Sequence, residues 1–288
     1  MNQLKLFTNL TRLKKPIGFM LLFWPCAWGL TLAYDFNQSL IKYYYYLLLF
    51  FLGSVLMRSA GCIVNDILDK EFDSKVFRTK NRPIASGKIS VKIAILYSLF
   101  LCILAFFVLI NFNLFTIVLA LGSMPLAFTY PLMKRFTYWP QFFLGITFNY
   151  GLILGWTAIK GQLDIVPILF YAGAIFWTLG YDTIYGYQDI KDDEIIGLKS
   201  TSIKFKGESK IFLFSCYFFL SVMFILGGYF LKFEYSYYLL LTIPFYHLFF
   251  YQMKIFNPHN PSSCLKAFKS NNIFGLIIFL IILIVKNL

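Results

Sequence analysis

Long apolar segments alternate with short polar ones from one end of the chain to the other. Each apolar segment holds about 20 residues, enough for a helix to cross a hydrocarbon core roughly 30 Å thick. The pattern predicts an all-α, polytopic membrane protein with about nine transmembrane helices, in one domain over residues 1–288. The expected segments are Pro16–Tyr34, Tyr43–Val64, Val91–Ile110, Leu114–Met133, Gln141–Ile159, Val166–Tyr185, Ile211–Phe230, Tyr237–Tyr251 and Ile273–Val285.

Composition and charge agree with this interpretation. Hydrophobic residues make up 59% of the chain, and the formal net charge is +13. Lys and Arg gather before the first expected helix and in alternate loops after it, as they do in loops retained on the cytoplasmic side. We therefore expect the N-terminus in the cytoplasm. The net charge reflects this topology and gives no reason to expect a nucleic-acid partner.

Other classes of site find little support. The segment before the first helix is basic but has no apolar run of its own, so we expect neither a signal nor a transit peptide. This favours a bacterial cell inner membrane. The 5 cysteines are scattered, and His247 and His259 are remote from the acidic residues. We therefore expect no disulfide framework, zinc site or haem site.

Most of the 13 acidic residues lie in two short stretches, NDILDKEFD and YDTIYGYQDIKDD, both on the expected cytoplasmic side. Helical geometry places three residues of the first stretch on one face, with Asp66 about 100° away. These three are Asn65, Asp69 and Asp73. The second stretch holds Asp182, Asp189 and Asp193. If this stretch is helical, their spacing places these side chains within about 20° of one line along the helix surface.

Facing carboxylates need a cation between them. At a separation of about 6 Å, two such groups repel by roughly 3 kcal/mol at an effective dielectric of 20. Oxygen ligands without His or Cys suit Mg²⁺, which also binds phosphate oxygens. The two stretches therefore indicate a site for a Mg²⁺-diphosphate. Basic residues available to the phosphates are Arg78, Lys80, Arg82, Lys134 and Arg135, although each basic group taken singly is more typical of a topology determinant.

Two charged residues lie deeper in the apolar segments. Arg58 precedes Asn65 by seven residues, so it lies on the same face of the second expected helix but deeper in the apolar segment. An arginine there costs roughly 2.5 kcal/mol or more of insertion free energy unless it has a partner or a polar cavity. It could bind a ligand or only neutralise a carboxylate. Asp182 could likewise serve the site or only hydrogen-bond a neighbour such as Thr183.

The chain resembles the UbiA superfamily of intramembrane prenyltransferases at four ordered motifs. NDILDKEFD is similar to the NDxxDxxxD motif of that family, and VFRTKNRPIASG is similar to its RTxxRPxxxG continuation. The loop Tyr130–Gln141 and the stretch Tyr181–Thr201 resemble two further motifs. The resemblance extends from about Leu13 to Thr201, and the last three helices add only hydropathy.

The resemblance implies a nine-helix bundle around a cavity that opens sideways to lipid. It is closest to the branch that transfers a polyprenyl group from its diphosphate to the ring carbon ortho to the hydroxyl of 4-hydroxybenzoate, in ubiquinone biosynthesis. Mg²⁺ is then the cofactor, and no obligate protein partner is implied. The residues that would hold the metal, six of them catalytic carboxylates, are Asn65, Asp66, Asp69, Asp73, Asp182, Asp189 and Asp193.

The resemblance also suggests roles for the remaining residues. The diphosphate would contact Arg78, Lys80, Arg82, Lys134 and Arg135. The aromatic acceptor would contact Arg58 or Arg135, together with Tyr130 and Tyr185. Tyr130, Tyr181 and Tyr185 are also candidates to stabilise an allylic cation through their ring faces.

Two alternatives stay open. The chain could prenylate another aromatic or quinone-precursor acceptor. More remotely, it could be a polytopic cation transporter, which would place carboxylates near the middle of the membrane with access from both sides.

Overall fold

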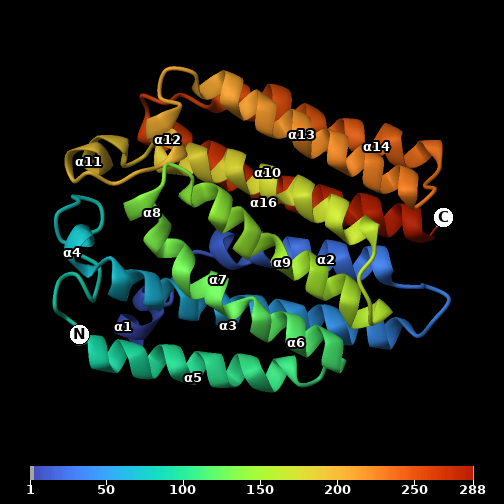
Figure 1. The fold of residues 1–288 in the computed structure, drawn as a ribbon, viewed down its shortest axis with the longest axis horizontal. Coiled ribbons are helices and arrows are strands. Elements are labelled where there is room, and N and C mark those ends of the chain that lie inside the picture. Colours follow the sequence, from blue (N-terminus) through green and yellow to red (C-terminus); the bar gives the residue numbers. More distant parts are fainter. Residues whose placement is uncertain (1–2, 288) are drawn as a thin grey trace.

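The computed structural model describes residues 3–287 as a bundle of long helices lying alongside one another (Figure 1). The longer helices are α1 (Gln3–Leu10), α2 (Ile17–Ala33), α3 (Leu40–Leu68), α5 (Val91–Leu109), α6 (Leu114–Gly122), α9 (Pro140–Lys160), α10 (Ile165–Gly186), α13 (Ser209–Phe230), α14 (Tyr235–Tyr246) and α16 (Pro261–Asn287). The shorter ones are α4 (Lys70–Asp73), α7 (Met124–Thr129), η1 (Tyr130–Leu132), α8 (Met133–Phe136), α11 (Ile190–Ile195), α12 (Thr201–Lys204), η2 (His247–Gln252) and α15 (Met253–Ile255). The single domain expected over residues 1–288 stays a prediction, and its residues 1, 2 and 288 lie outside the described part.

The all-α, multi-pass architecture is confirmed. Within residues 3–287, seven helical segments are long and apolar enough to cross a membrane. They are Leu40–Leu68, Val91–Leu109, Leu114–Phe136, Pro140–Lys160, Ile165–Gly186, Ser209–Phe230 and Pro261–Asn287. α2 is apolar but shorter, at 17 residues. The eighth expected segment is helical but divided into α14, η2 and α15.

Two segments differ from their expected bounds for identifiable reasons. The expected helix Leu114–Met133 is broken into α6, α7 and η1, with Pro125 and Pro131 at the starts of α7 and η1. Proline lacks the N–H that continues a helix. Conversely, α16 begins at Pro261 rather than near Ile273, because its polar first half is paired within the bundle. Trp177 Nε1 donates to Asn271 Oδ1 over 2.8 Å, for example.

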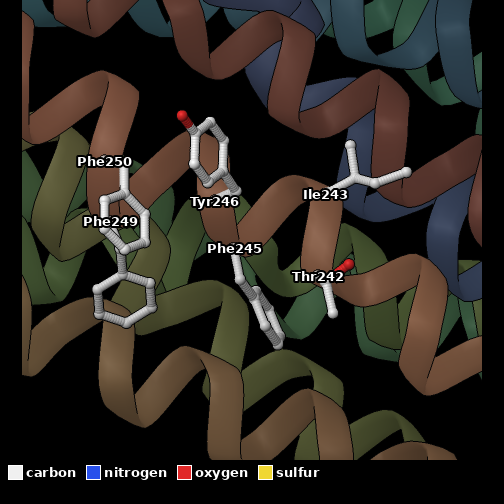
Figure 2. Close-up of a pocket in the computed structure, with 6 residues that line it drawn as sticks. All are labelled: Thr242, Ile243, Phe245, Tyr246, Phe249 and Phe250. Atoms are coloured by element: carbon white, nitrogen blue, oxygen red, sulfur yellow. The ribbon is translucent and has the colours of Figure 1, made fainter.

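The outer surface near α14 is apolar. Figure 2 shows a hollow beside the π-helical turn η2, with all its drawn residues coming from α14 and η2. Ile243, Tyr246 and Phe250 are exposed there, and no charged side chain lines the hollow. Such a surface suits contact with lipid chains and offers no group for acid–base or metal chemistry.

The centre of the bundle is built on aromatic rings and on very close helix packing. Trp28 of α2 lies 5.2 Å from Trp177 of α10 between ring centroids. A Cβ at Gly29 would overlap the backbone carbonyl of Leu152 in α9, and one at Gly155 would lie against the carbonyl of Cys26 in α2. In membranes, such small residues let helix backbones approach and gain packing energy. The close contact therefore fixes the relative position of α2 and α9, which both continue to the end of the bundle that carries the acidic stretches.

We expect Gly29→Ala to destabilise the protein by about 1–3 kcal/mol, because α2 and α9 must separate to admit the methyl group. The matched control is Gly61→Ala in α3, where an added Cβ meets nothing within 4 Å. Alanine there favours the helix by up to roughly 1 kcal/mol. Thermal unfolding in detergent measures both variants. Equal melting temperatures for the two would contradict the close contact.

Candidate active site

The two acidic stretches meet at one end of the bundle. Figure 1 shows α4, which follows α3, and α11, which follows α10, at that end. A cavity of about 1160 Å³ lies between these elements. It is lined by all the acidic-stretch residues singled out from the sequence, namely Asn65, Asp66, Asp69, Asp73, Asp182, Asp189 and Asp193.

The shared face of Asn65, Asp69 and Asp73 continues across a break in the helix. α3 ends at Leu68, and α4 begins at Lys70. The backbone N–H of Asp69 still donates to the Asn65 carbonyl over 2.9 Å, and that of Asp73 donates to the Asp69 carbonyl over 2.8 Å. Because this four-residue spacing continues across the break, the side chains stay on the cavity side.

Four carboxylates of this end are paired with cations from other segments. Arg82 Nη1 bridges Asp66 at 3.1 Å and Asp73 at 2.6 Å. Lys134 Nζ lies 2.5 Å from Asp69 Oδ2. Two further pairs are Arg12 with Asp66 and Arg78 with Asp189. The basic residues thus neutralise acidic groups that would otherwise repel one another.

Burial leaves some of these carboxylates poorly satisfied. It raises the pKa of Asp69, against the opposing effect of Lys134. Burial, and then the nearby charge of Asp189, raise the pKa of Asp193 to about 6. Both groups therefore hold a proton more readily than an ordinary carboxyl, and an added cation would favour its release.

The ligand atoms fit a hard divalent cation. Asp69 Oδ1 is buried, and no residue in the described part of the chain forms a hydrogen bond with it. The surrounding donors are carboxylate and amide oxygens, the type that Mg²⁺ prefers. Across residues 3–287, no group of three or more Asp, Glu, His or Cys side chains forms a ready metal cage. The carboxylates would have to leave their Arg and Lys partners to bind a metal.

The expected phosphate-binding cations divide into two groups. Arg78, Arg82 and Lys134 line the cavity. Lys80 does not line it, is exposed, and lies over the ring of Phe77 at 4.6 Å. Arg135 is also outside the lining, because its Nη2 donates to the Leu68 carbonyl over 2.6 Å.

The deeper part of the cavity holds the expected acceptor-binding residues. The Arg58 guanidinium lies 5.2 Å from the ring centroid of Phe148, and none of residues 3–287 accepts a hydrogen bond from its buried Nε. Gly18 makes room for it, since a Cβ there would lie 2.9 Å from that Nε. Tyr130 lines the same cavity. Tyr185 also lines it, but its hydroxyl accepts a hydrogen bond from Arg78 Nη1 over 3.1 Å.

Two contributions were missed from the sequence. Arg12 was counted only as a topology signal, yet it reaches Asp66 from a left-handed turn after α1, at φ 56°. Lys269 and Asn272 of α16 also line the cavity. The polar run KSNN within an otherwise apolar helix could have indicated this, since polar residues inside a membrane helix usually face a cavity or a partner.

Known proteins resemble the chain over nearly its whole length. The sequence profile of the UbiA prenyltransferase family matches residues 22–279. The mitochondrial 4-hydroxybenzoate polyprenyltransferase of Dictyostelium discoideum is 43% identical over 298 residues, covering 100% of this chain. The chain spans only 62% of that protein's length. The Homo sapiens protein of the same name is 43% identical over 279 residues, covering 95% of this chain and 73% of that protein.

Solved structures share the fold. The apo structure of a UbiA homolog from Aeropyrum pernix K1 has a TM-score of 0.76 at 22% identity, covering 92% of this chain and 97% of that one. A UbiA homolog from Archaeoglobus fulgidus, bound to GPP and Mg²⁺, has a TM-score of 0.73 at 18% identity. That match covers 98% of this chain and 100% of the other.

Proposed function

The chain belongs to the UbiA prenyltransferase family, and on that premise we propose that it is a Mg²⁺-dependent 4-hydroxybenzoate polyprenyltransferase of ubiquinone biosynthesis. It takes the polyprenyl group from a polyprenyl diphosphate and joins it to the ring carbon ortho to the phenol hydroxyl. Relatives that carry this name and match nearly all of this chain support the choice of acceptor.

The observation that carries the proposal is the pairing of opposite charges at one end of the cavity. Asp69 is paired with Lys134, and Asp66 and Asp73 share Arg82. A Mg²⁺-diphosphate brings both signs of charge with it, so it can replace each of these pairs. The carboxylates would then hold the metal, and the Arg and Lys side chains would bind the phosphate oxygens.

The chain's own residues then have distinct tasks in the reaction. The metal would be held by Asn65, Asp66, Asp69, Asp73, Asp189 and Asp193. When bound, Mg²⁺ neutralises the diphosphate and so favours its departure. Arg78, Arg82 and Lys134 stabilise the negative charge that grows on the leaving diphosphate.

The bond changes balance without any further reagent. The allylic C–O bond breaks, and the diphosphate leaves with the electron pair. The ring carbon of the acceptor forms the new C–C bond, and the ring proton is lost. Asp182 lines the cavity and lies close enough to Arg58 for electrostatic interaction, so it is our choice to receive a proton from the acceptor. Apolar walls keep water from the allylic cation.

Arg58 is the proposed partner of the acceptor's carboxylate. Its guanidinium lies in the cavity, where no described residue accepts a hydrogen bond from Nε. Arg135, in contrast, lies outside the cavity and donates to a backbone carbonyl. A benzoate carboxylate would supply the charge and the hydrogen-bond acceptor that the buried guanidinium needs.

We also propose that all nine helical segments cross a bacterial cell inner membrane, with the cavity end toward the cytoplasm. Support comes from the basic residues that gather at the cavity end, as in loops retained in the cytoplasm. The names of the relatives place those proteins in mitochondria, and the proposed location of this chain does not rest on them.

A cation transporter fits the arrangement less well. Its carboxylates should lie near the middle of the membrane, along a path open to both sides. Here they gather at one end beside cations suited to phosphates. A prenyltransferase that uses another aromatic acceptor remains the second candidate function, because the Mg²⁺-diphosphate end would be the same.

We expect purified protein in detergent to transfer a radiolabelled polyprenyl group to 4-hydroxybenzoate with Mg²⁺ but not with excess EDTA. Asp69→Asn should lower this rate by about 100-fold or more, because it weakens a metal ligand close to the developing charge. Glu71→Gln is the matched control, since Glu71 belongs to the same stretch but is exposed and outside the cavity lining.

Each other result has a definite meaning. Activity that survives EDTA or the Asp69→Asn substitution would refute the metal site. Transfer to a different aromatic compound, with none to 4-hydroxybenzoate, would keep the metal site and overturn the acceptor.

Arg58→Gln should raise the KM for 4-hydroxybenzoate by roughly 10- to 100-fold, the worth of a charge-assisted hydrogen bond. The KM for the polyprenyl diphosphate should change little. Arg135→Gln serves as the comparison and should leave the acceptor's KM near its original value. The opposite ranking of the two variants would transfer the carboxylate-binding role to Arg135.

A further inference from the structure

A chain of buried hydrogen bonds leads from α9 to the wall of the cavity. Asn149 of α9 donates from Nδ2 to the Oγ1 of Thr178 in α10 over 2.7 Å. Thr178 Oγ1 donates in turn to the hydroxyl oxygen of Tyr181 over 3.2 Å. Asn149 and Thr178 are completely buried, and Tyr181 is 1% exposed. The reaction steps described above make no use of these three residues.

The direction of this chain is fixed at its start. Asn149 Nδ2 also donates to the Gly145 carbonyl over 2.8 Å. A carbonyl oxygen only accepts, so the atom that faces it must be the amide nitrogen rather than the amide oxygen. Thr178 therefore accepts from Asn149 and uses its single proton on Tyr181. The Tyr181 hydroxyl already accepts one bond, and its own proton is left to donate.

The remaining proton of Tyr181 lies in reach of the cavity. Tyr181 is among the lining residues, and its hydroxyl is close enough to interact electrostatically with Asp182, Arg58 and Tyr130, which also line it. Its ring is held by Trp177 at 5.0 Å and by Phe268 at 5.8 Å between centroids. Among residues 3–287, no acceptor takes this proton. A buried hydroxyl that is fixed in orientation and has no hydrogen-bond acceptor is destabilising, so we expect a bound ligand to accept this proton.

Resting on the proposed function, we propose that the Tyr181 hydroxyl donates a hydrogen bond to the phenolic oxygen of the aromatic acceptor. Arg58 carries the positive charge and therefore suits the carboxylate. The neutral hydroxyl of Tyr181 suits the oxygen at the other end of the ring. Thr178 and Asn149 are positioning residues, because they act only through Tyr181.

This assignment gives the cavity a means of selecting hydroxylated aromatic acids. A ligand that lacks the ring hydroxyl leaves the Tyr181 proton without a partner in a buried place. Sites built around such a donor discriminate strongly against the analogue without the matching oxygen. Benzoate is the simplest analogue of this kind, and it retains the carboxylate for Arg58.

The test compares 4-hydroxybenzoate as substrate with benzoate as competitor. Tyr181→Phe should raise the KM for 4-hydroxybenzoate by roughly 3- to 10-fold, as expected for one neutral hydrogen bond. The inhibition constant of benzoate and the KM for the polyprenyl diphosphate should not change. A purely structural role would alter all three constants together.

Thr178 provides a second and independent pair of variants. Thr178→Val removes the hydroxyl with little change in shape and should raise the acceptor's KM in the same direction. Thr178→Ser keeps the hydroxyl and should restore it. The double variant of Thr178→Val with Tyr181→Phe should match Tyr181→Phe alone, because the two residues act as one unit. If Tyr181→Phe does not fold, the Thr178 pair still decides the matter.

The outcomes separate this role from the proposed function. No transfer to 4-hydroxybenzoate by the unaltered protein would overturn the proposed function itself. The unaltered protein could transfer normally while Tyr181→Phe leaves both the KM for 4-hydroxybenzoate and the inhibition constant of benzoate unchanged. That result would overturn only the role of Tyr181. Equal weakening of benzoate and 4-hydroxybenzoate would place the Tyr181 contact on the carboxylate and contradict the assignment. Additive effects in the double variant would exclude Thr178 as its positioning residue.

Discussion

Charge neutralisation at one end of the cavity is the constraint on which the other features depend. Carboxylates crowded together in a medium of low dielectric repel one another and lose hydration, so they are stable only beside cations. The chain supplies those cations from distant segments. Arg82 comes from the turn after α4, Lys134 from α8, and Arg12 from the turn after α1. The ion pairs therefore tie together segments that share no helix, and the cavity lies between them.

The same pairs suggest how an apolar bundle could hold the Mg²⁺-diphosphate of the proposed function. A diphosphate alone would add negative charge beside Asp66, Asp69 and Asp73, and a metal ion alone would meet Arg82 and Lys134. When both arrive together, each charge in the cavity keeps an opposite partner. In the proposed reaction, the aromatic acid would lie in the deeper part of the cavity, beside Phe148 and Arg58.

The sequence predicted those features that follow from local spacing. The four-residue intervals from Asn65 to Asp73 indicated one shared face, and all of these residues line the cavity. Spacing carries no information about partners far along the chain. It could not place Arg12 on Asp66, or show that Arg135 is held by the Leu68 carbonyl while Lys80 lies outside. The early start of α16 was also missed, because the polar first half of this helix is stabilised by distant contacts such as that of Trp177 with Asn271.

Calorimetric titration of the purified protein with Mg²⁺, in the presence and absence of an unreactive prenyl diphosphate analogue, tests the exchange of partners most directly. If the carboxylates are freed only when phosphates take their Arg and Lys partners, Mg²⁺ should bind at least about 10-fold more tightly with the analogue present. By the same linkage, Mg²⁺ should tighten binding of the analogue equally. Equal Mg²⁺ affinity in the two titrations would contradict the account, because metal and diphosphate would then occupy independent sites.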